Sequence, residues 1–84
     1  MRITYDEAKR QSNIAKHGLD FAVLEVEFFM SCRIGAAKQG RFLAIGTLHE
    51  TLVIAVIFRP LGAEAISVVS MRRASAKERK LING

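Results

Sequence analysis

The sequence has very few of the residues that form covalent or metal-bound frameworks. Its 84 residues include one cysteine, one proline and no tryptophan. Cys32 cannot form an internal disulfide, and it has no CxxC partner that would indicate a zinc site. A hydrophobic core therefore has to stabilise the chain, and the free thiol fits a reducing compartment such as the cytoplasm.

Long apolar segments are also absent. The longest apolar run, LVIAVIF at 52–58, is far shorter than the ~20 residues that a membrane-spanning helix needs. No apolar segment follows Met1, because the N-terminal part of the chain is rich in charged side chains. We therefore expect neither a secretion signal nor contact with a membrane.

Apolar and basic side chains, by contrast, are plentiful. Half of the residues are apolar, which is enough for one hydrophobic core and predicts a single domain over residues 1–84. The chain has 13 Lys and Arg against 8 Asp and Glu, which gives a net charge of +5. A basic surface of this kind favours a polyanion or an acidic protein as partner, and nucleic acid comes first among the polyanions.

The N-terminal segment has clear signals for local structure. Residues 2–5 alternate polar and apolar side chains, which predicts a short strand. A helix is expected over 7–17, with Asp6 as its N-cap and Gly18 after its last turn. A second helix is expected over 21–29, although part of that segment also alternates like a strand.

The rest of the chain is sheet-like until its last residues. Three strands are expected, over 41–48, 51–58 and 63–72. The first two form an antiparallel hairpin around a tight turn, a second turn follows at 59–62, and the apolar third strand is expected in the sheet centre, covered on both faces. A final helix over 75–82 starts at an S-x-x-E capping box. Helices packed on an antiparallel sheet of about four strands make this an α+β fold.

The first helix has a candidate site on one face. Four polar side chains lie three or four residues apart: Lys9, Asn13, Lys16 and His17. Residues at this spacing share a helix face. Two cations, an amide and an imidazole suit phosphate binding and proton transfer near neutral pH. A solvated face that ends in a histidine is the simpler alternative, and the spacing alone leaves both open.

A second basic cluster, MRRASAKERK at 71–80, closes the chain. Its candidate phosphate ligands are Arg72, Arg73, Arg79 and Lys80. Arginine binds phosphate with a planar fork and offsets the charge that develops on a pentavalent phosphorus. Glu78 in this segment is either the capping-box residue, a catalytic acid, or both, and a solvated basic tail is again the simpler alternative.

Other chemical motifs are weak or missing. Arg41 enters a strand and becomes a candidate only if the sheet places it beside Arg72. Neither His17 nor His49 has the spacing of a metal ligand, and the sequence contains no nucleotide-binding loop or nucleophile elbow. We therefore expect no metal and no cofactor.

Three segments, in this order, resemble the BrnT family. They are YDEAKRQSNIAKHGLDF at 5–21, RFLAIG at 41–46 and ISVVSMRRASAKER at 66–79. The resemblance implies a RelE-like fold and a metal-independent ribonuclease that arrests translation. It also implies a BrnA-type antitoxin with a ribbon-helix-helix DNA-binding domain, which would bind the toxin in a hetero-oligomer.

The resemblance also implies which residues act. The positions that match the family pattern are Lys16, His17, Arg41, Arg72, Glu78 and Arg79. Our hypothesis is that Lys16 or His17 helps to remove the ribose 2′-OH proton, while the arginines hold the scissile phosphate. Further RNA contacts are expected from Lys9, Asn13, Arg73 and Lys80.

Two features depart from the family pattern. The segment between Phe29 and Arg41 lacks the acidic loop common in relatives, and Lys80 stands where many relatives have a tyrosine. These departures keep open a catalytically weak or inactive module that binds RNA or antitoxin. A DNA-binding regulator ranks lower, because no helix-turn-helix pattern is present.

Overall fold

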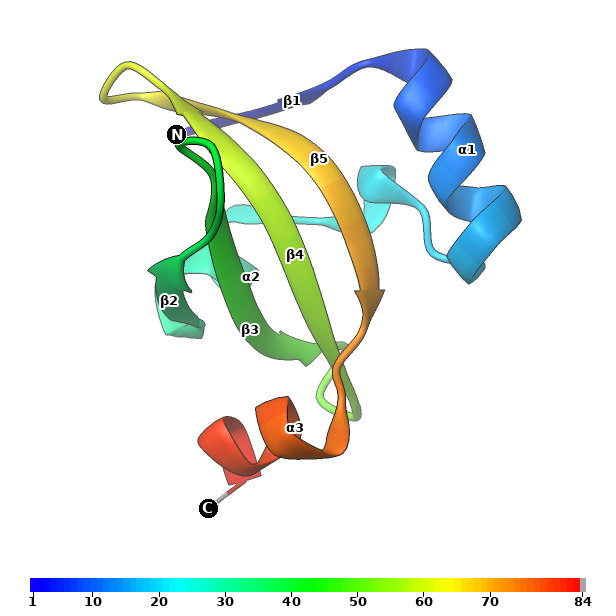
Figure 1. The fold of residues 1–84 in the computed structure, drawn as a ribbon, viewed down its shortest axis with the longest axis vertical. Coiled ribbons are helices and arrows are strands. Elements are labelled where there is room, and N and C mark those ends of the chain that lie inside the picture. The colour runs from blue at the N-terminus through cyan, green and yellow to red at the C-terminus, as the bar shows by residue number, and fades with distance from the viewer. Residues whose placement is uncertain (84) are drawn as a thin grey trace.

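The computed structural model describes residues 1–83 and shows helices packed against one mixed sheet (Figure 1). The elements are β1 (Arg2–Tyr5), α1 (Glu7–His17), the 3₁₀ turn η1 (Phe21–Val23), α2 (Val26–Ser31), β2 (Arg33–Ala36), β3 (Phe42–Leu48), β4 (Leu52–Leu61), β5 (Ala65–Arg73) and α3 (Ala76–Asn83). Within this range, no helix is long and apolar enough to cross a membrane.

The sheet has five strands in the order β1-β5-β4-β3-β2. The α+β class is confirmed, but the expected number of about four strands is wrong. The additional strand, β2, pairs antiparallel with β3 through four exposed residues, so its sequence has no apolar alternation to reveal it. β1 pairs with β5 in parallel, so the sheet is mixed rather than antiparallel.

The two faces of the sheet are covered unequally. On one face, buried side chains from η1 and α2, such as Phe21 and Phe28, pack against Ile54, Val56 and Val68 of the sheet. On the other face, α3 packs mainly on β3 and β4, with its Ile82 packed in a smaller cluster. The rest of that second side, which we call the open face, carries these side chains of β4 and β5: Ile57, Arg59, Ser67, Ser70 and Arg72.

The expected position of β5 is therefore confirmed only in part. β5 lies between β1 and β4, as a central strand should. Its open-face residues Ser67, Ser70 and Arg72 remain half-exposed, although Arg72 forms an ion pair with Glu78 of α3. This strand is thus fully covered on one face only.

The first helix matches its prediction. The Asp6 side chain accepts a hydrogen bond from the backbone N–H of Ala8, and Gly18 adopts the left-handed conformation with φ 69°. The Gly18 N–H donates to the Ile14 carbonyl at 2.8 Å, which closes the last turn. Lys16 and His17 are thereby fixed at the C-terminal end of α1.

The second helix is shorter than expected. Asp20 caps η1 by accepting a hydrogen bond from the Ala22 N–H at 2.9 Å, and the chain is then extended at Leu24 before α2 begins at Val26. The expected helix over 21–29 is wrong, because a turn followed by a short helix also buries Phe21, Leu24 and Phe28.

The turn expected at 59–62 lies further along the chain. β4 continues through Pro60 to Leu61, and Gly62 turns with φ 68°. The last β3–β4 pair is Phe42 with Phe58, so beyond it β4 borders β5 alone. A residue without an N–H is tolerated at such an edge.

Candidate active site

All four predicted α1 residues line a shallow groove between α1 and β5. The lining residues are Lys9, Ser12, Asn13, Lys16, His17, Val69 and Ser70. Lys9, Lys16 and His17 are exposed, so two amines and an imidazole are available to a ligand from solvent. Ser70 also lies on the open face, because it pairs with Ile57. The groove is therefore continuous with the open face.

Asn13, the fourth residue of the predicted α1 face, lines the same groove but is only 5% exposed. Its amide donates to the carbonyls of Leu19 and Met71, both at 2.9 Å, and accepts a hydrogen bond from the Met71 N–H at 3.0 Å. These bonds occupy both N–H groups of the amide and attach α1 to the edge of β5.

A β-bulge sets which side chains of β5 reach the open face. The register shifts between Ile57 and Phe58, which pair with Ser70 and Val68 and leave Val69 as the extra residue. Met71 is consequently fully buried in the core, and Arg72, paired with Ala55, points to the open face. Without the bulge, strict alternation would exchange these two side chains.

Arg72 forms a bidentate ion pair with Glu78. The Nη1–Oε1 and Nη2–Oε2 distances are 2.8 and 3.0 Å. Glu78 also accepts a hydrogen bond from the Ser75 N–H at 2.8 Å, and its own N–H donates to the Ser75 hydroxyl at 3.2 Å. The predicted capping box is confirmed, and the same carboxylate fixes the guanidinium of Arg72.

This contact lowers the pKa of Glu78 to about 2. The main cause is the hydrogen bonding with Arg72, and the Ser75 N–H lowers the pKa further. Glu78 in turn raises the pKa of Arg72. A carboxylate with so low a pKa stays ionised at neutral pH and is a weak proton acceptor.

The remaining basic residues of the C-terminal cluster are dispersed. Arg79 donates from Nη1 to the Ala74 carbonyl at 3.1 Å, close to Arg72 in the chain. Arg73 pairs with Ile54 and therefore points to the face opposite Arg72. Lys80 is exposed on α3.

Arg41 is not beside Arg72. β4 separates their strands, because β3 pairs with β4 and Arg72 pairs with Ala55. The Ala37 N–H donates to the Arg41 carbonyl, so the β2–β3 ladder continues to Arg41. Alternation from Leu43, which packs under α3, then places Arg41 on the same side as the open face. Its Nε is buried and has no hydrogen-bond partner among the described residues.

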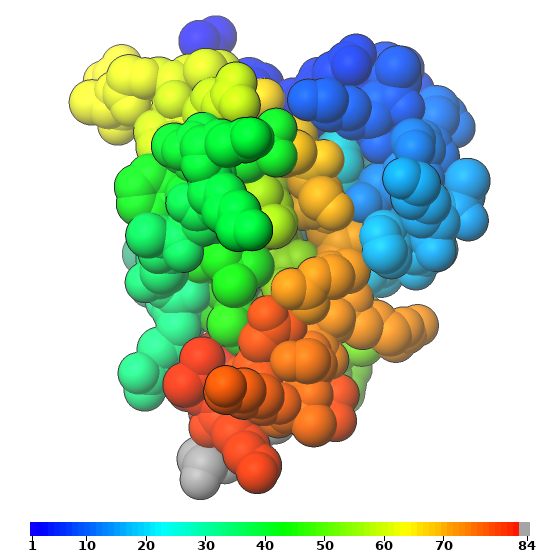
Figure 2. Space-filling model, in the orientation of Figure 1, coloured from blue at the N-terminus to red at the C-terminus, as the bar shows by residue number. Residues whose placement is uncertain are grey.

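The fold thus brings the two predicted clusters to one part of β5. Figure 2 shows α1, the end of β5 and α3 on the same side of the molecule. The groove of α1 includes Ser70, and Arg72 with Glu78 follows two residues later. An anion that lies over Ser70 therefore has cations from both ends of the sequence beside it.

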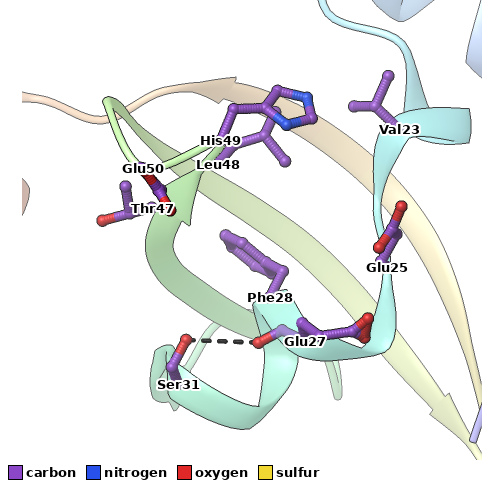
Figure 3. A pocket seen from close by; sticks show the side chains of 9 residues that line it. All are labelled: Val23, Glu25, Glu27, Phe28, Ser31, Thr47, Leu48, His49 and Glu50. Atoms are coloured by element: carbon purple, nitrogen blue, oxygen red, sulfur yellow. Dashed lines mark hydrogen bonds between the residues drawn. The ribbon is translucent and has the colours of Figure 1, made fainter.

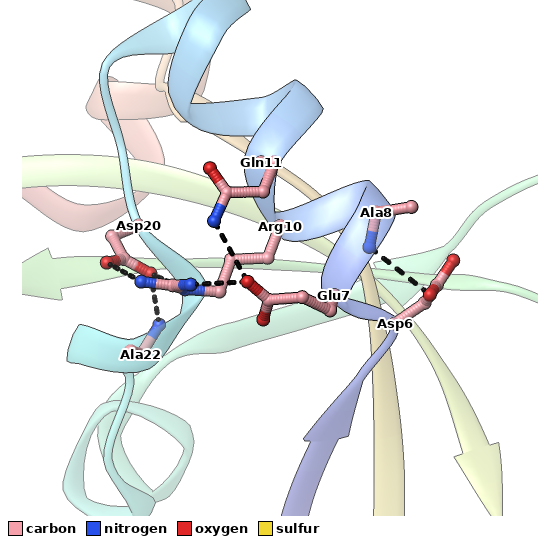
Figure 4. A network of polar contacts seen from close by, with 7 residues as sticks. All are labelled: Asp6, Glu7, Ala8, Arg10, Gln11, Asp20 and Ala22. Atoms are coloured by element: carbon pink, nitrogen blue, oxygen red, sulfur yellow. Dashed lines mark hydrogen bonds and ion pairs between the residues drawn. The ribbon is translucent and has the colours of Figure 1, made fainter.

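A network that the predicted site does not include positions α1 (Figure 4). Arg10 Nε and Nη2 donate to Asp20 at 2.7 and 3.0 Å, and Arg10 Nη1 donates to Glu7 at 2.8 Å. The bond to Arg10 is the main cause that lowers the pKa of Asp20. Glu7 and Arg10 at i,i+3 were a usable sequence signal, but the partner Asp20 lies beyond the helix.

A separate pocket lies between α2 and the β3–β4 hairpin (Figure 3). Its lining includes Glu25, Glu27, Glu50 and His49, and none of the predicted site residues. His49 is exposed, as its turn position indicated. Burial raises the pKa of the Cys32 thiol nearby in the sequence, which disfavours the nucleophilic thiolate. This acidic side of the molecule does not suit RNA.

Comparison with known proteins gives two findings. The family model for the ribonuclease toxin BrnT of type II toxin–antitoxin systems matches residues 5–78. The 1.1 Å crystal structure of the Brucella abortus ribonuclease toxin BrnT is similar, with 57% sequence identity and a TM-score of 0.85. The match covers 89% of this chain and 97% of that one. None of the curated proteins matches this chain.

Proposed function

The chain belongs to the BrnT family of ribonuclease toxins of type II toxin–antitoxin systems, and from this we propose that it cleaves RNA and thereby inhibits translation. The observation that carries the proposal is the meeting of two basic clusters at Ser70 to Arg72 of β5. One cluster supplies an imidazole and amines, and the other supplies guanidinium groups. We propose that residues 1–84 act as one RelE-like domain.

The reaction follows from these groups. Lys16 or His17 takes the proton of a ribose 2′-OH, and the 2′-oxygen attacks the adjacent phosphorus. The bond from phosphorus to the 5′-oxygen breaks, and that oxygen leaves with a proton. The products are a 2′,3′-cyclic phosphate, or the 3′-phosphate formed by its hydrolysis, and a 5′-OH. No step of this mechanism requires a metal ion.

We assign to Arg72 and Arg79 the stabilisation of the charge that develops on the scissile phosphate. Glu78 fixes the guanidinium of Arg72, so we assign it a positioning role rather than that of a proton acceptor. Arg41 lies two strands from Arg72, and we assign it to RNA further along the chain. Lys9, Arg73 and Lys80 remain proposed RNA contacts.

A type II toxin–antitoxin family implies an antitoxin partner. We infer a BrnA-type protein with a ribbon-helix-helix domain that forms a hetero-oligomer with this chain in the cytoplasm. A basic toxin surface of net charge +5 attracts acidic segments of such a partner before contact.

One observation favours a second candidate, a module of the same fold that binds RNA or antitoxin without cleavage. Glu78 neutralises Arg72, which removes one charge that catalysis would use. This candidate and the nuclease share the same surface, so RNA binding alone does not separate them.

Expression in a bacterial host separates the two candidates. Wild type should slow growth and degrade RNA. His17→Ala and Arg72→Ala should each lower cleavage by ~10²–10⁴-fold, the range for a lost acid–base or charge-stabilising group. The matched controls His49→Ala and Arg33→Ala remove an exposed histidine and an exposed arginine elsewhere, and should remain toxic.

Two outcomes would overturn parts of this account. A wild type that binds RNA but neither slows growth nor degrades RNA establishes the non-cleaving module. A toxic wild type whose His17 and Arg72 variants remain fully toxic retains the function and removes the site.

A further inference from the structure

We propose that Arg59, with Arg41, forms a second phosphate-binding position on the open face, which holds a phosphate further along the same RNA strand than the scissile one. The inference rests on the proposed ribonuclease function. Nothing in the basic clusters of the sequence indicates Arg59, which precedes the single proline in an expected turn. The structure instead places it in the extended part of β4.

The register of the sheet places the two arginines next to each other at the end of the β3–β4 pairing. Phe42 pairs with Phe58 as the last pair, so Arg41, the residue before β3, and Arg59 of β4 both adjoin that pair. Phe42 and Phe58 both pack in the main core. Alternation therefore directs the neighbouring side chains to the opposite side, which is the open face. Adjacent strands lie ~4.8 Å apart, close enough for two guanidinium groups to contact one phosphate.

The neighbours of this pair are hydroxyls rather than carboxylates. Arg59 pairs with Ser67 of β5, and Ser67 pairs with Thr4 of β1, so all three share a face. The Thr4 hydroxyl donates to the Ile66 carbonyl at 2.8 Å. A phosphate placed there meets the Ser67 hydroxyl as a donor and no carboxylate from these neighbouring strands.

The positive charges of Arg41 and Arg59 are not balanced by a carboxylate within the described residues. Among residues 1–83, neither Arg41 nor Arg59 forms an ion pair, whereas Arg10 and Arg72 both do. Two neighbouring guanidinium groups repel each other, which lowers the stability of the fold. No ion pair among residues 1–83 offsets this repulsion. A bound phosphate removes that repulsion.

The pair lies apart from the proposed scissile site. Arg59 is four residues along β4 from Ala55, the partner of Arg72. At ~3.4 Å per residue this separates the two positions by ~14 Å. Ile57 and Ser70 lie between them on the same face. RNA that crosses the open face therefore meets Arg72 first and the pair of Arg41 and Arg59 at a phosphate further along the strand, beyond the adjacent one.

The test uses a short, fully 2′-O-methylated RNA oligonucleotide, which cannot be cleaved by 2′-OH attack. Its Kd is measured for wild type, Arg59→Gln, Arg59→Lys and the charge-matched control Arg33→Gln over a series of salt concentrations. Arg33 lies on β2 and pairs with Ile45, far along β3 from Arg41. Cleavage of unmodified RNA by wild type is measured in parallel.

Arg59→Gln should weaken binding about tenfold at low salt, as expected for loss of a charge-assisted contact. It should also lower the slope of log Kd against log salt by ~0.7, the value for one phosphate of a single strand. Arg59→Lys should restore most of the slope, and Arg33→Gln should match wild type in both quantities.

The inference is overturned if Arg59→Gln and Arg33→Gln have the same Kd and the same slope. That result leaves the proposed function intact when wild type still cleaves unmodified RNA. A wild type that neither binds the oligonucleotide at low salt nor cleaves RNA overturns both.

Discussion

Asn13 illustrates how a single side chain can belong to the fold although its type and spacing suggest a ligand. Its amide bonds both backbone groups of Met71, which lies 58 residues away in the sequence. β1 ends at Tyr5, so it does not reach this part of the β5 edge. The amide therefore replaces a missing strand partner, and loss of such buried bonds costs about 1–3 kcal/mol for each group left unpaired.

Glu78 has two structural tasks at the residue scale. Its carboxylate completes the capping box with Ser75 and holds Arg72 in a bidentate pair. The ordinary pKa of a glutamate, 4.5, falls to about 2 in the folded chain. Protonation of Glu78 therefore weakens both contacts at once.

The pH dependence of stability tests this coupling. Because the pKa of Glu78 is lower in the folded chain, its contribution is complete above pH 4.5 and is lost as the pH falls toward about 2. Glu78→Gln should cost about 1–2 kcal/mol at neutral pH through the lost charged bonds. Urea unfolding from pH 7 to 2 should show a smaller decline in stability for this variant than for wild type.

The control for this experiment is Glu27→Gln, which changes an exposed carboxylate on α2 that forms no ion pair among the described residues. It should follow the wild-type curve. If Glu78→Gln also follows it across the acid range, the ion pair with Arg72 does not contribute to stability.

At the scale of elements, α2 lies close against β3 because of Gly46. A Cβ atom at this position would be 2.8 Å from the Phe28 ring and 3.1 Å from Cys32 Cβ. Phe28 is 5% exposed and belongs to the main core, so its ring has little space to move. The absence of a side chain at residue 46 sets the distance between helix and sheet.

Two glycine-to-alanine substitutions should therefore differ in their effect on the stability of the fold. Gly46→Ala should destabilise the chain by about 1–3 kcal/mol through overpacking. Gly35→Ala is the matched control on β2, where a Cβ meets nothing within 4 Å, and should be neutral or stabilising by up to ~1 kcal/mol. Thermal or urea unfolding measures both, and equal midpoints for the two variants would contradict the packing argument.

The elements that could be predicted are those with local signals. Asp6 and Gly18 delimit α1, the turn at 49–50 joins β3 to β4, and Ser75 with Glu78 begins α3. Features set by distant partners could not be predicted in this way. They include the exposed strand β2, the parallel pairing of β1 with β5, and the bulge that buries Met71.

The same distinction applies to the candidate site. The residue types in both basic clusters were visible in the sequence, and the fold brings Lys16 and His17 near the strand that carries Arg72. The sequence did not reveal that Glu78 holds Arg72, or that Arg59 faces the same side as Arg41. These relations depend on strand register and on the turn from β5 into α3.

At the scale of the whole molecule, a cluster of glutamates and a cluster of basic side chains lie at different places on the surface. Three glutamates surround the pocket between α2 and the hairpin, while the groove of α1 and the open face carry lysines and arginines. A field arranged in this way directs a polyanion to one face and orients it there. We therefore expect RNA that binds this face to lie near His17 and Lys16.

The central claim is that this chain cleaves RNA by attack of a ribose 2′-OH. The most direct test mixes the purified protein, in EDTA, with an RNA and with the same RNA carrying a single 2′-deoxy nucleotide at the mapped cleavage position. We predict that the RNA is cut to a 2′,3′-cyclic phosphate or 3′-phosphate and a 5′-OH, and that the deoxy substrate stays intact at that position. Equal cleavage of both substrates, or loss of RNA cleavage in EDTA, would contradict the mechanism.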